Sequence, residues 1–287
     1  MADSVMVPRM TITTGDVFIP EIWAKEALIA RESKLLMSKL VERYDEDAAE
    51  GGDTINIPII SNLTASAKVA STSVTLQAPT ESDVNLSLNR HFESSILIED
   101  RLLKQSKRVY AILTKYAERA GYAVAKQQDS DLLGLYSSLS NYVGDGSTAP
   151  TRTNILRAIQ YLDDAEAPEE ERYGVWKPAA VADILDIDGF VNAEKAGTVL
   201  PLRKGVIGDL FGVMNYKTTQ VVTEAGTPSV NHNLIFHKSA FAMAVQMAIR
   251  TQFQYKQEYL GTLCTVDSLW GYGVQRADHA VDFRSSV

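Results

Sequence analysis

Cysteine is almost absent from this sequence, and its scarcity limits what the protein can be. The 287 residues contain one cysteine, Cys264, so no internal disulfide can form. A chain without disulfides suits a reducing compartment. Because free cysteines are usually buried, we predict that Cys264 is a small core residue.

Long apolar runs and clusters of positive charge are also missing. No run of about 18 apolar residues occurs, so we expect no membrane span. The N-terminus has no basic region followed by an apolar run, so no secretory signal is visible. The net charge is −8, and an acidic chain does not bind nucleic acid tightly through phosphate neutralisation. With 45% hydrophobic residues, the chain can nevertheless build a core.

Local signatures of catalysis are absent as well. The sequence has no Gly-x-Ser-x-Gly elbow, no P-loop and no Gly-x-Gly-x-x-Gly turn. The spacing of its four histidines matches no zinc-binding motif. They are His91, His232, His237 and His279. For His232 and His237 we favour hydrogen-bonded or solvated histidines over a metal pair.

Three acidic fragments have weak claims to a site. The segment 186–189 matches only part of a calcium loop, and Gly144-Asp145-Gly146 favours a surface turn. Asp129 and Asp131 are two residues apart and do not share a helix face. We therefore assign no catalytic, cofactor-binding or metal-binding residue and predict that the protein is not an enzyme.

The densest run of charge lies between residues 163 and 171, which read Asp-Asp-Ala-Glu-Ala-Pro-Glu-Glu-Glu. Acidic residues are favourable near a helix start, and Pro168 suits such a start. We predict a solvated face or turn, and a contact with a cation or partner remains the alternative.

The order of the segments is the most informative feature that is present. Residues 1–17 read as an extended arm, and an apolar face at helical spacing follows Pro20. Thr54 to Ile59 alternates as a half-buried strand, and Val84, Leu86 and Leu88 alternate as a returning strand. Between them lies a stretch of small and polar residues, with too little apolar surface to hold a hairpin alone. It is either a disordered loop or a hairpin that orders against another chain.

A long helical pattern follows, from about Ile98 to Leu139. Its apolar stripe spans about 50–60 Å if it is one helix. A turn-rich break at 141–152 precedes an α/β region with a helix from Ile155 to Ala165, capped by Thr153 or Asn154. That region also predicts a strand near Tyr173 and a helix from Ala179 to about Leu185. From Asn233 onward the pattern predicts strands.

In this order the segments resemble the major capsid proteins of tailed bacteriophages, which have the HK97-like fold. The resemblance is carried by Pro20-Glu21-Ile22-Trp23, the segment 52–58, the segments 86–90 and 96–100, the glycine-rich segment 205–213, and the segments 236–242 and 272–278. It covers essentially the whole chain.

The resemblance implies an α+β, HK97-like capsid fold. Its parts would be an N-terminal arm (1–20), an N-terminal helix (21–52), an extended hairpin called the E-loop (53–97), a spine helix with the peripheral domain (98–149), an axial domain (150–231) and returning peripheral strands (232–287). It also implies a major capsid protein that self-assembles as hexamers and pentamers into an icosahedral head around double-stranded DNA, without a cofactor.

The same resemblance implies partners and a location. Portal and scaffolding proteins are expected partners, a decoration protein is a further one, and contact with packaged DNA would be non-specific. The protein would be made in the host cytoplasm and reside in the virion, away from any membrane. Because the arm begins at once, we expect a separate scaffolding protein. Lys68 lies in the loop, but no partner asparagine can be matched, so we infer no cross-link.

The residues expected to contact neighbouring subunits are Phe18, Trp23, Ile57, Lys68, Val74, Leu76 and Arg90. Two other functions stay open from the sequence. One is an encapsulin-type compartment shell, and the other is a soluble α/β enzyme with a lid at 60–85.

Overall fold

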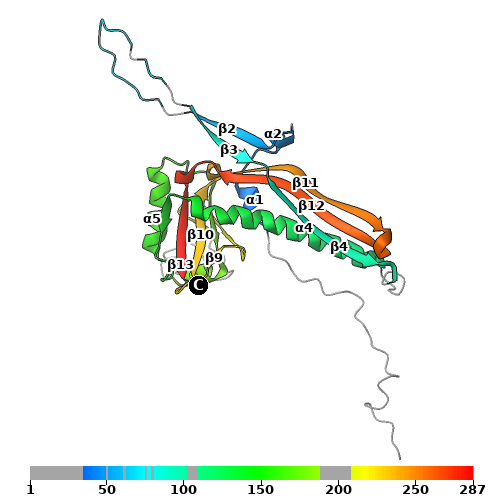
Figure 1. Cartoon of the computed structure of the whole chain (residues 1–287). Coiled ribbons are helices and arrows are strands. Elements are labelled where there is room, and N and C mark those ends of the chain that lie inside the picture. Colours follow the sequence, from blue (N-terminus) through cyan, green and yellow to red (C-terminus); the bar gives the residue numbers. More distant parts are fainter. Residues whose placement is uncertain are drawn as a thin grey trace, which may run out of the picture. The chain divides into compact units, whose positions relative to one another are not determined.

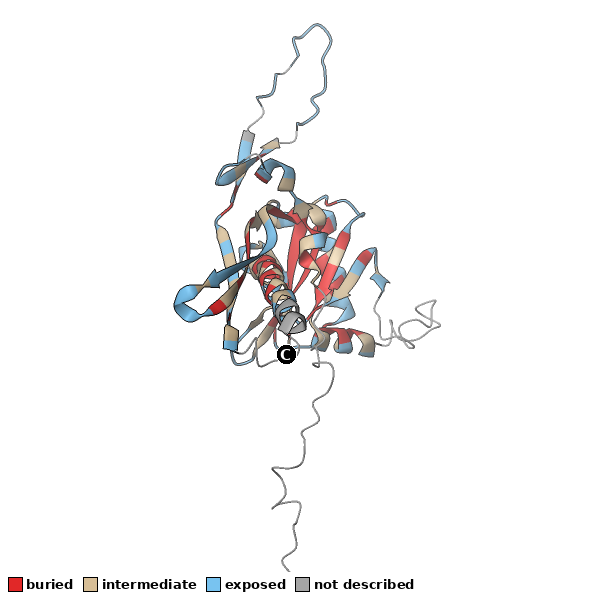
Figure 2. Cartoon of the chain, turned by 90° about the vertical axis from the view of Figure 1, so that its right-hand side faces the viewer, coloured by how far each residue is buried: buried red, intermediate tan, exposed pale blue. Residues whose placement is uncertain are grey.

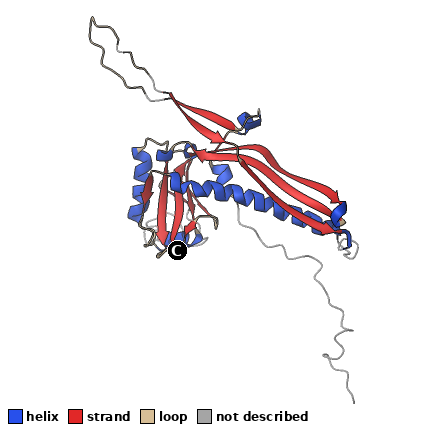
Figure 3. Ribbon diagram, in the orientation of Figure 1, coloured by secondary structure: helices blue, strands red, loops and turns tan. Residues whose placement is uncertain are grey.

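The computed structural model describes residues 35–49, 51–60, 63–74, 76–78, 81–101, 109–187 and 208–286. Within them the strands form three sheets, of four, seven and two strands. Figure 3 shows helices lying against the two larger sheets. None of the helices in these residues has the length and apolarity needed to span a membrane. The predicted arm and most of the helix after Pro20 lie outside the described residues.

The four-stranded sheet is built around one long antiparallel hairpin. Its strands, in spatial order, are β1 (Glu42–Arg43), β11 (Phe241–Lys256), β12 (Gly261–Val274) and β4 (Arg90–Glu99). The 3-10 turn η4 (Gln257–Tyr259) closes the hairpin of β11 and β12. Along β4, residues 92, 94, 96 and 98 are more buried than their neighbours, so one face of the strand packs inward.

The long helix α4 (Val109–Leu133) lies against this sheet, alongside β4 and β12 (Figure 1). Ala120 and Val124 are buried on the face that meets the strands, and Leu132 and Leu133 are completely buried near the helix end. The turn η2 (Gly134–Ser138) continues from α4. At about 1.5 Å per residue, the 25 residues of α4 span about 37 Å.

The predicted helix from Ile98 to Leu139 is therefore wrong at its beginning. Ile98 belongs to β4, where it pairs with Thr262 of β12. The segment around Ile96 and Ile98 alternates and is β-branched, so its local preference is for a strand, and the partner strand lies far away in the sequence. The regular helix also ends at Leu133, before the 3-10 turn.

The second of the two larger sheets has seven strands. Its order is β5 (Asn141–Val143), β13 (Ala280–Ser286), β10 (Val230–His237), β6 (Arg172–Trp176), β8 (Val213–Lys217) and β7 (Asp209–Leu210), with β9 (Thr223–Glu224) pairing beside β10. Two helices pack in the same core, α5 (Arg152–Asp164) and α6 (Pro178–Asp186). The predicted helices and the strand near Tyr173 are confirmed.

Two local predictions in this region are corrected. The N-cap of α5 is Thr151, whose side chain accepts a hydrogen bond from the Asn154 backbone N–H at 3.2 Å, and not Thr153 or Asn154. No helix starts at Pro168. The acidic run instead contains the last residues of α5 and the loop before β6, because Arg172 begins a strand that pairs with β10.

The two larger sheets are joined by a double crossover. The chain leaves β10 through η3 (Lys238–Ala240) to enter β11, and it leaves β12 through η5 (Ala277–His279) to enter β13. The two crossings touch, since the backbone N–H of Gln275 donates to the Ala240 carbonyl at 2.8 Å. A single cluster of buried residues therefore contains side chains from both sheets and from α4. Figure 2 shows the buried residues gathered on these strands.

The two-stranded sheet consists of β2 (Thr54–Ile60) and β3 (Glu81–Ser87), paired over seven residues. Its base has a core of its own, in which Leu86 and Leu88 meet Ala242 and Ala244 of β11. Gly271 of β12 allows this close crossing, because a Cβ there would lie 2.5 Å from the Ser87 carbonyl oxygen. The predicted inward alternation of the returning strand is confirmed.

Leu132 offers a test of the shared core. We expect Leu132→Ala to lower the free energy of unfolding by about 2–5 kcal/mol, because a fully buried leucine leaves a cavity in a packed core. Leu97→Ala, at a position that is 38% exposed, is the matched control and should cost less than about 1 kcal/mol. Equal losses in chemical denaturation would contradict the assignment of the core.

Candidate assembly surfaces

The segment between β2 and β3 exposes apolar side chains that nothing in the described chain covers. Its four larger apolar residues are Leu63, Val69, Val74 and Leu76, which are 64–88% exposed. Four large apolar side chains exposed on one short segment make it a candidate interaction site. Residues 63–78 are called the hairpin loop below.

The hydrogen bonds of the hairpin loop stay within it. The Thr64 backbone N–H donates to Gln77 Oε1 at 3.0 Å, and Gln77 Nε2 donates back to the Thr64 carbonyl. Lys68 Nζ donates to the carbonyls of Val69 and Thr72. Among the described residues, no hydrogen bond joins the loop to the rest of the chain. The loop is therefore held together locally but has no contact that fixes it against its own subunit.

Two residues predicted as contacts between subunits are engaged inside the chain. Ile57 is only 6% exposed and belongs to the core at the base of β2 and β3, so it packs within the chain, and its contact with a neighbour stays a prediction. The reason is that the base of the hairpin crosses β11 and β12, which supply the missing apolar partner. Arg90 donates to the Tyr272 hydroxyl at 2.7 Å and lies over the Tyr272 ring, although 42% of its side chain remains exposed.

The remaining predicted contacts stay untested. Val74 and Leu76 are 65% and 88% exposed, and Lys68 is exposed with its ammonium turned to the loop carbonyls. Phe18 and Trp23 lie outside the described residues.

The distal half of β11 is a second surface that lacks a covering element. β1 pairs only with Ala242 and Met243, so within the described residues the outer edge of β11 has no strand partner beyond them. Residues 248–255 are all exposed, and they include the large apolar side chains of Ile249, Phe253 and Tyr255 at 42%, 57% and 49%. An open, apolar strand edge of this length is a template for pairing with another chain.

Buried charges inside the subunit are, by contrast, well paired. Arg250 donates two hydrogen bonds of 2.9 Å to Asp267, and His91 Nε2 lies 3.2 Å from the same carboxylate. The Arg250 guanidinium lowers the pKa of Asp267 to about 2. Asp129 accepts from the backbone N–H groups of Leu36 and Ser38, which fixes α1 (Met37–Leu40) against α4.

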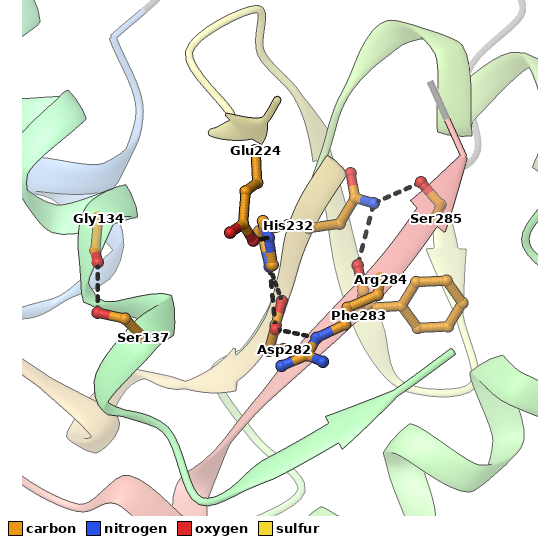
Figure 4. Close-up of polar contacts among 9 residues, drawn as sticks. Gly134, Ser137, Glu224, His232, Asp282, Phe283, Arg284 and Ser285 are labelled. Carbon is orange, nitrogen blue, oxygen red and sulfur yellow. Dashed lines mark hydrogen bonds and ion pairs between the residues drawn. The ribbon is translucent and has the colours of Figure 1, made fainter. Parts of the chain in front are cut away.

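A polar cluster around His232 ties three elements of the seven-stranded sheet to the end of α4. His232 Nδ1 lies 3.0 and 3.1 Å from the two Asp282 oxygens, and its Nε2 lies 3.3 Å from Glu224 Oε2 (Figure 4). Arg284 donates to Asp282 at 2.9 Å, and the Tyr136 ring stacks on the imidazole at 3.9 Å. His232 is thus hydrogen-bonded, as predicted, and its partners come from distant parts of the sequence.

The double crossover contains a second histidine cluster. Ser239 Oγ lies 2.7 Å from His237 Nδ1 and 2.9 Å from His279 Nδ1, so one hydroxyl connects η3 with η5. Desolvation by burial lowers the pKa of both histidines, and their mutual proximity lowers the pKa of His237 further. No sequence motif marked this cluster, because its members meet only when the two crossings pack.

Two smaller predictions are confirmed by the geometry. Cys264 is 2% exposed, and burial raises the pKa of its thiol. Asp145 stabilises a surface turn by accepting hydrogen bonds from both the backbone and the hydroxyl groups of Ser147 and Thr148, which lower its pKa to about 2.

No protein-family model and no curated protein matches the sequence. Several solved structures, however, are similar to this chain in fold. The chain is similar to a chain of Mycobacterium phage Che8 with a TM-score of 0.77 and 21% identity, covering 93% of this chain and 97% of that one. It is similar to the capsid of Cyanophage P-SCSP1u with a TM-score of 0.76 and 18% identity, covering 95% and 94%. For the mature capsid of bacteriophage PhiM1 the TM-score is 0.73 and the identity 13%, over 93% and 92%. The expected α+β, HK97-like capsid fold is confirmed by this likeness.

The crossover histidines predict a pH-dependent stability. Because burial lowers the pKa of His237 and His279, the unfolded chain takes up their protons first as pH falls. Their contribution is complete above about pH 6.5, the ordinary histidine value, and is lost below it. We expect the free energy of unfolding to fall more between pH 7.5 and 5.0 in the original subunit than in the double variant His237→Asn, His279→Asn.

Chemical denaturation of both proteins at the two pH values measures this difference. Asparagine keeps a polar atom near the Nδ1 position but does not titrate. Any packing change in the variant therefore affects its stability equally at both pH values and drops out of the comparison. Identical pH dependence of the two proteins would contradict the role assigned to these histidines.

Proposed function

We propose that this chain, whose fold is that of phage capsid chains, is the major capsid protein of a tailed phage. Subunits assemble as hexamers and pentamers and close into an icosahedral head around double-stranded DNA. The observation that carries this proposal is the likeness in fold to capsid chains over more than nine-tenths of the length of both chains.

Two surfaces of the subunit support an assembly role. The hairpin loop exposes Val74 and Leu76 and makes no hydrogen bond to the rest of its described subunit. Ordering a backbone costs about 1–2 kcal/mol per residue, and this segment recovers little of it within its own chain. Contacts with a neighbouring subunit would supply the remainder. The open edge of β11, with Phe253 and Tyr255, is a surface that a neighbour would cover.

Assembly needs no catalytic residue, and we propose a structural protein without enzyme activity or cofactor. Many weak contacts per subunit, repeated around a closed shell, would give a stable particle. The protein would be made in the host cytoplasm and reside in the virion. Portal and scaffolding proteins are the proposed partners, and a decoration protein is a further one.

The net charge of −8 has a role in this proposal. An acidic lining would repel the phosphates of packaged DNA and keep contacts with the genome weak and non-specific. The genome would then remain mobile during packaging and release. Negative-stain microscopy of the purified protein tests the proposal directly, and the content of the particles separates a phage head from an encapsulin-type shell. A protein that stays monomeric under assembly conditions would overturn it.

Removal of the hairpin loop is the first specific test. We expect deletion of Thr64–Thr80 to leave a soluble, folded subunit that forms no shells. Three residues would then join Ile60 to Glu81, a pair at the end of the β2–β3 ladder, and this length suits a tight hairpin. Circular dichroism measures folding and microscopy measures assembly. Normal particles from the deleted protein would count decisively against the proposed role of the loop.

The edge of β11 is the second test. We expect Phe253→Glu together with Tyr255→Glu to reduce particle yield at least tenfold, because two buried charges at a contact are costly. Both side chains are about half exposed in the subunit, so the core is undisturbed, and the subunit loses only the exposed hydrogen bond that the Tyr255 hydroxyl donates to Asp100 at 2.8 Å. The control is Gln252→Glu with Gln254→Glu, at exposed positions on the opposite face of the same strand. A larger effect of the control would place the contact on that other face.

A further inference from the structure

The helix α5 has its charges arranged against its own dipole. Arg152 is the first residue of the helix, and its last two residues are Asp163 and Asp164. The N-terminal end of a helix is partially positive and favours acidic residues, whereas the C-terminal end favours basic ones. At the C-terminal end, Asp163 gains an ion pair with the buried Arg172 at 2.7 Å. At the N-terminal end, local stability does not explain the placement of Arg152. Sites where a local rule is broken without an internal gain are candidates for function.

A groove runs beside the basic part of α5. It has a volume of about 370 Å³ and lies between β5 and α5, with Tyr142, Asn154, Arg157 and Tyr161 among its lining. β5 is an edge strand of the seven-stranded sheet, so its outer side has no strand partner within the described residues. Tyr142 is 59% exposed on that strand. The groove is thus a polar and aromatic surface bordered by an open sheet edge.

Arg157 lines the groove, Arg152 is the first residue of the same helix, and the two with the groove are called the Arg152–Arg157 groove below. Neither arginine has an acidic partner in the described part of the subunit. Arg152 and Arg157 are both exposed, and neither takes part in an ion pair there. Arg284, which is next to the groove strand, is already engaged with Asp282 and lies over the Tyr142 ring. The free positive charge of the surface therefore comes from α5.

The acidic run after α5 supplies the complementary charge. Two of its residues are neutralised within the subunit, since Asp163 pairs with Arg172 at 2.7 Å and Glu171 pairs with Lys238 at 2.9 Å. Glu166, Glu169 and Glu170 are exposed and form no ion pair among the described residues. These three residues are called the acidic turn.

We propose that the acidic turn of one subunit docks on the Arg152–Arg157 groove of a second copy of this chain. This inference rests on the proposed assembly function and names one contact that would orient neighbours around a ring. The groove and the acidic turn are different patches, so the contact can repeat head-to-tail, and it forms a ring where the rotation between neighbours closes. Complementary charge mainly fixes the register and accelerates correct encounters, and its effect weakens as salt rises.

Charge reversal tests the contact. The groove variant is Arg152→Glu with Arg157→Glu, and the turn variant is Glu166→Lys, Glu169→Lys and Glu170→Lys. Each variant gives the neighbouring patches like charge, so we expect particle yield at low salt to fall at least tenfold. The protein carrying all five substitutions restores opposite charges and should recover most of the yield.

The helix dipole separates this role from a structural one. Arg152→Glu places an acidic residue at the start of α5, so the groove variant should unfold at the same or a higher temperature than the original protein. If the two arginines served only the stability of the subunit, substituting them would lower the unfolding temperature. A variant that keeps its unfolding temperature but forms few particles therefore supports a role in assembly.

The matched control for the groove variant is Arg119→Glu with Lys126→Glu. It changes the net charge by the same amount as the groove variant, at exposed positions of α4. We expect the control to assemble normally. An equal loss in the control, no loss in the two patch variants, or no recovery in the combined variant would each overturn the proposed contact. Failure of the unaltered protein to form particles would instead overturn the proposed function.

Discussion

The packing of the double crossover is the constraint on which the rest of this structure depends. The strands β10 and β13 continue through η3 and η5 into β11 and β12, so two sheets share two neighbouring connections. The crossings are held by the Ala240 carbonyl, by Ser239 between two histidines and by the surrounding apolar cluster. Because the crossings pack on each other, residues from both sheets contribute to one core, together with the buried end of α4.

This shared core explains which surfaces are complete within one subunit and which are not. The base of β2 and β3 is complete, since Leu86 and Leu88 find Ala242 and Ala244 beneath them. The hairpin loop has no such support within the described residues, and its four larger apolar side chains are 64–88% exposed. The outer half of β11 also lacks a partner within the described residues, because β1 pairs only with Ala242 and Met243. Incomplete surfaces on a well-packed body are what an assembling subunit needs.

The electrostatics follow the same division. Buried carboxylates have partners within the chain, as Asp267 has in Arg250 and Asp282 has in Arg284, because an unpaired buried charge is costly. Charges on α5 are exposed, remain unpaired at its basic end and oppose the helix dipole. Charge therefore stabilises the folded subunit at buried positions, whereas the exposed arginines of α5 have no such role within the described residues.

The amino-acid sequence determined the elements with strong local signals. The alternation of Val84, Leu86 and Leu88, the existence of a helix over Ile155–Ala165 and the burial of Cys264 follow from hydrophobic periodicity and residue type, which are local properties. The cap at Thr151 was found only in the structure. Order and spacing of segments were enough to predict the capsid fold. The absence of local catalytic signatures turned the prediction toward a structural protein.

Only the tertiary structure decided where long-range partners meet. The segment around Ile98 became a strand because β12, more than 150 residues later, pairs with it. Ile57 is a core residue because it packs in one cluster with Ala242 and Ala244 of β11. Arg90 donates a hydrogen bond to the Tyr272 hydroxyl of β12. The histidines of the crossover have no signature in the sequence, since His237 and His279 come from two separate crossings. The groove beside α5 is formed by neighbouring segments, but it exists only because α5 packs beside β5. Local preference fixes an element's type, whereas burial and pairing between distant segments decide its boundaries and its exposed face.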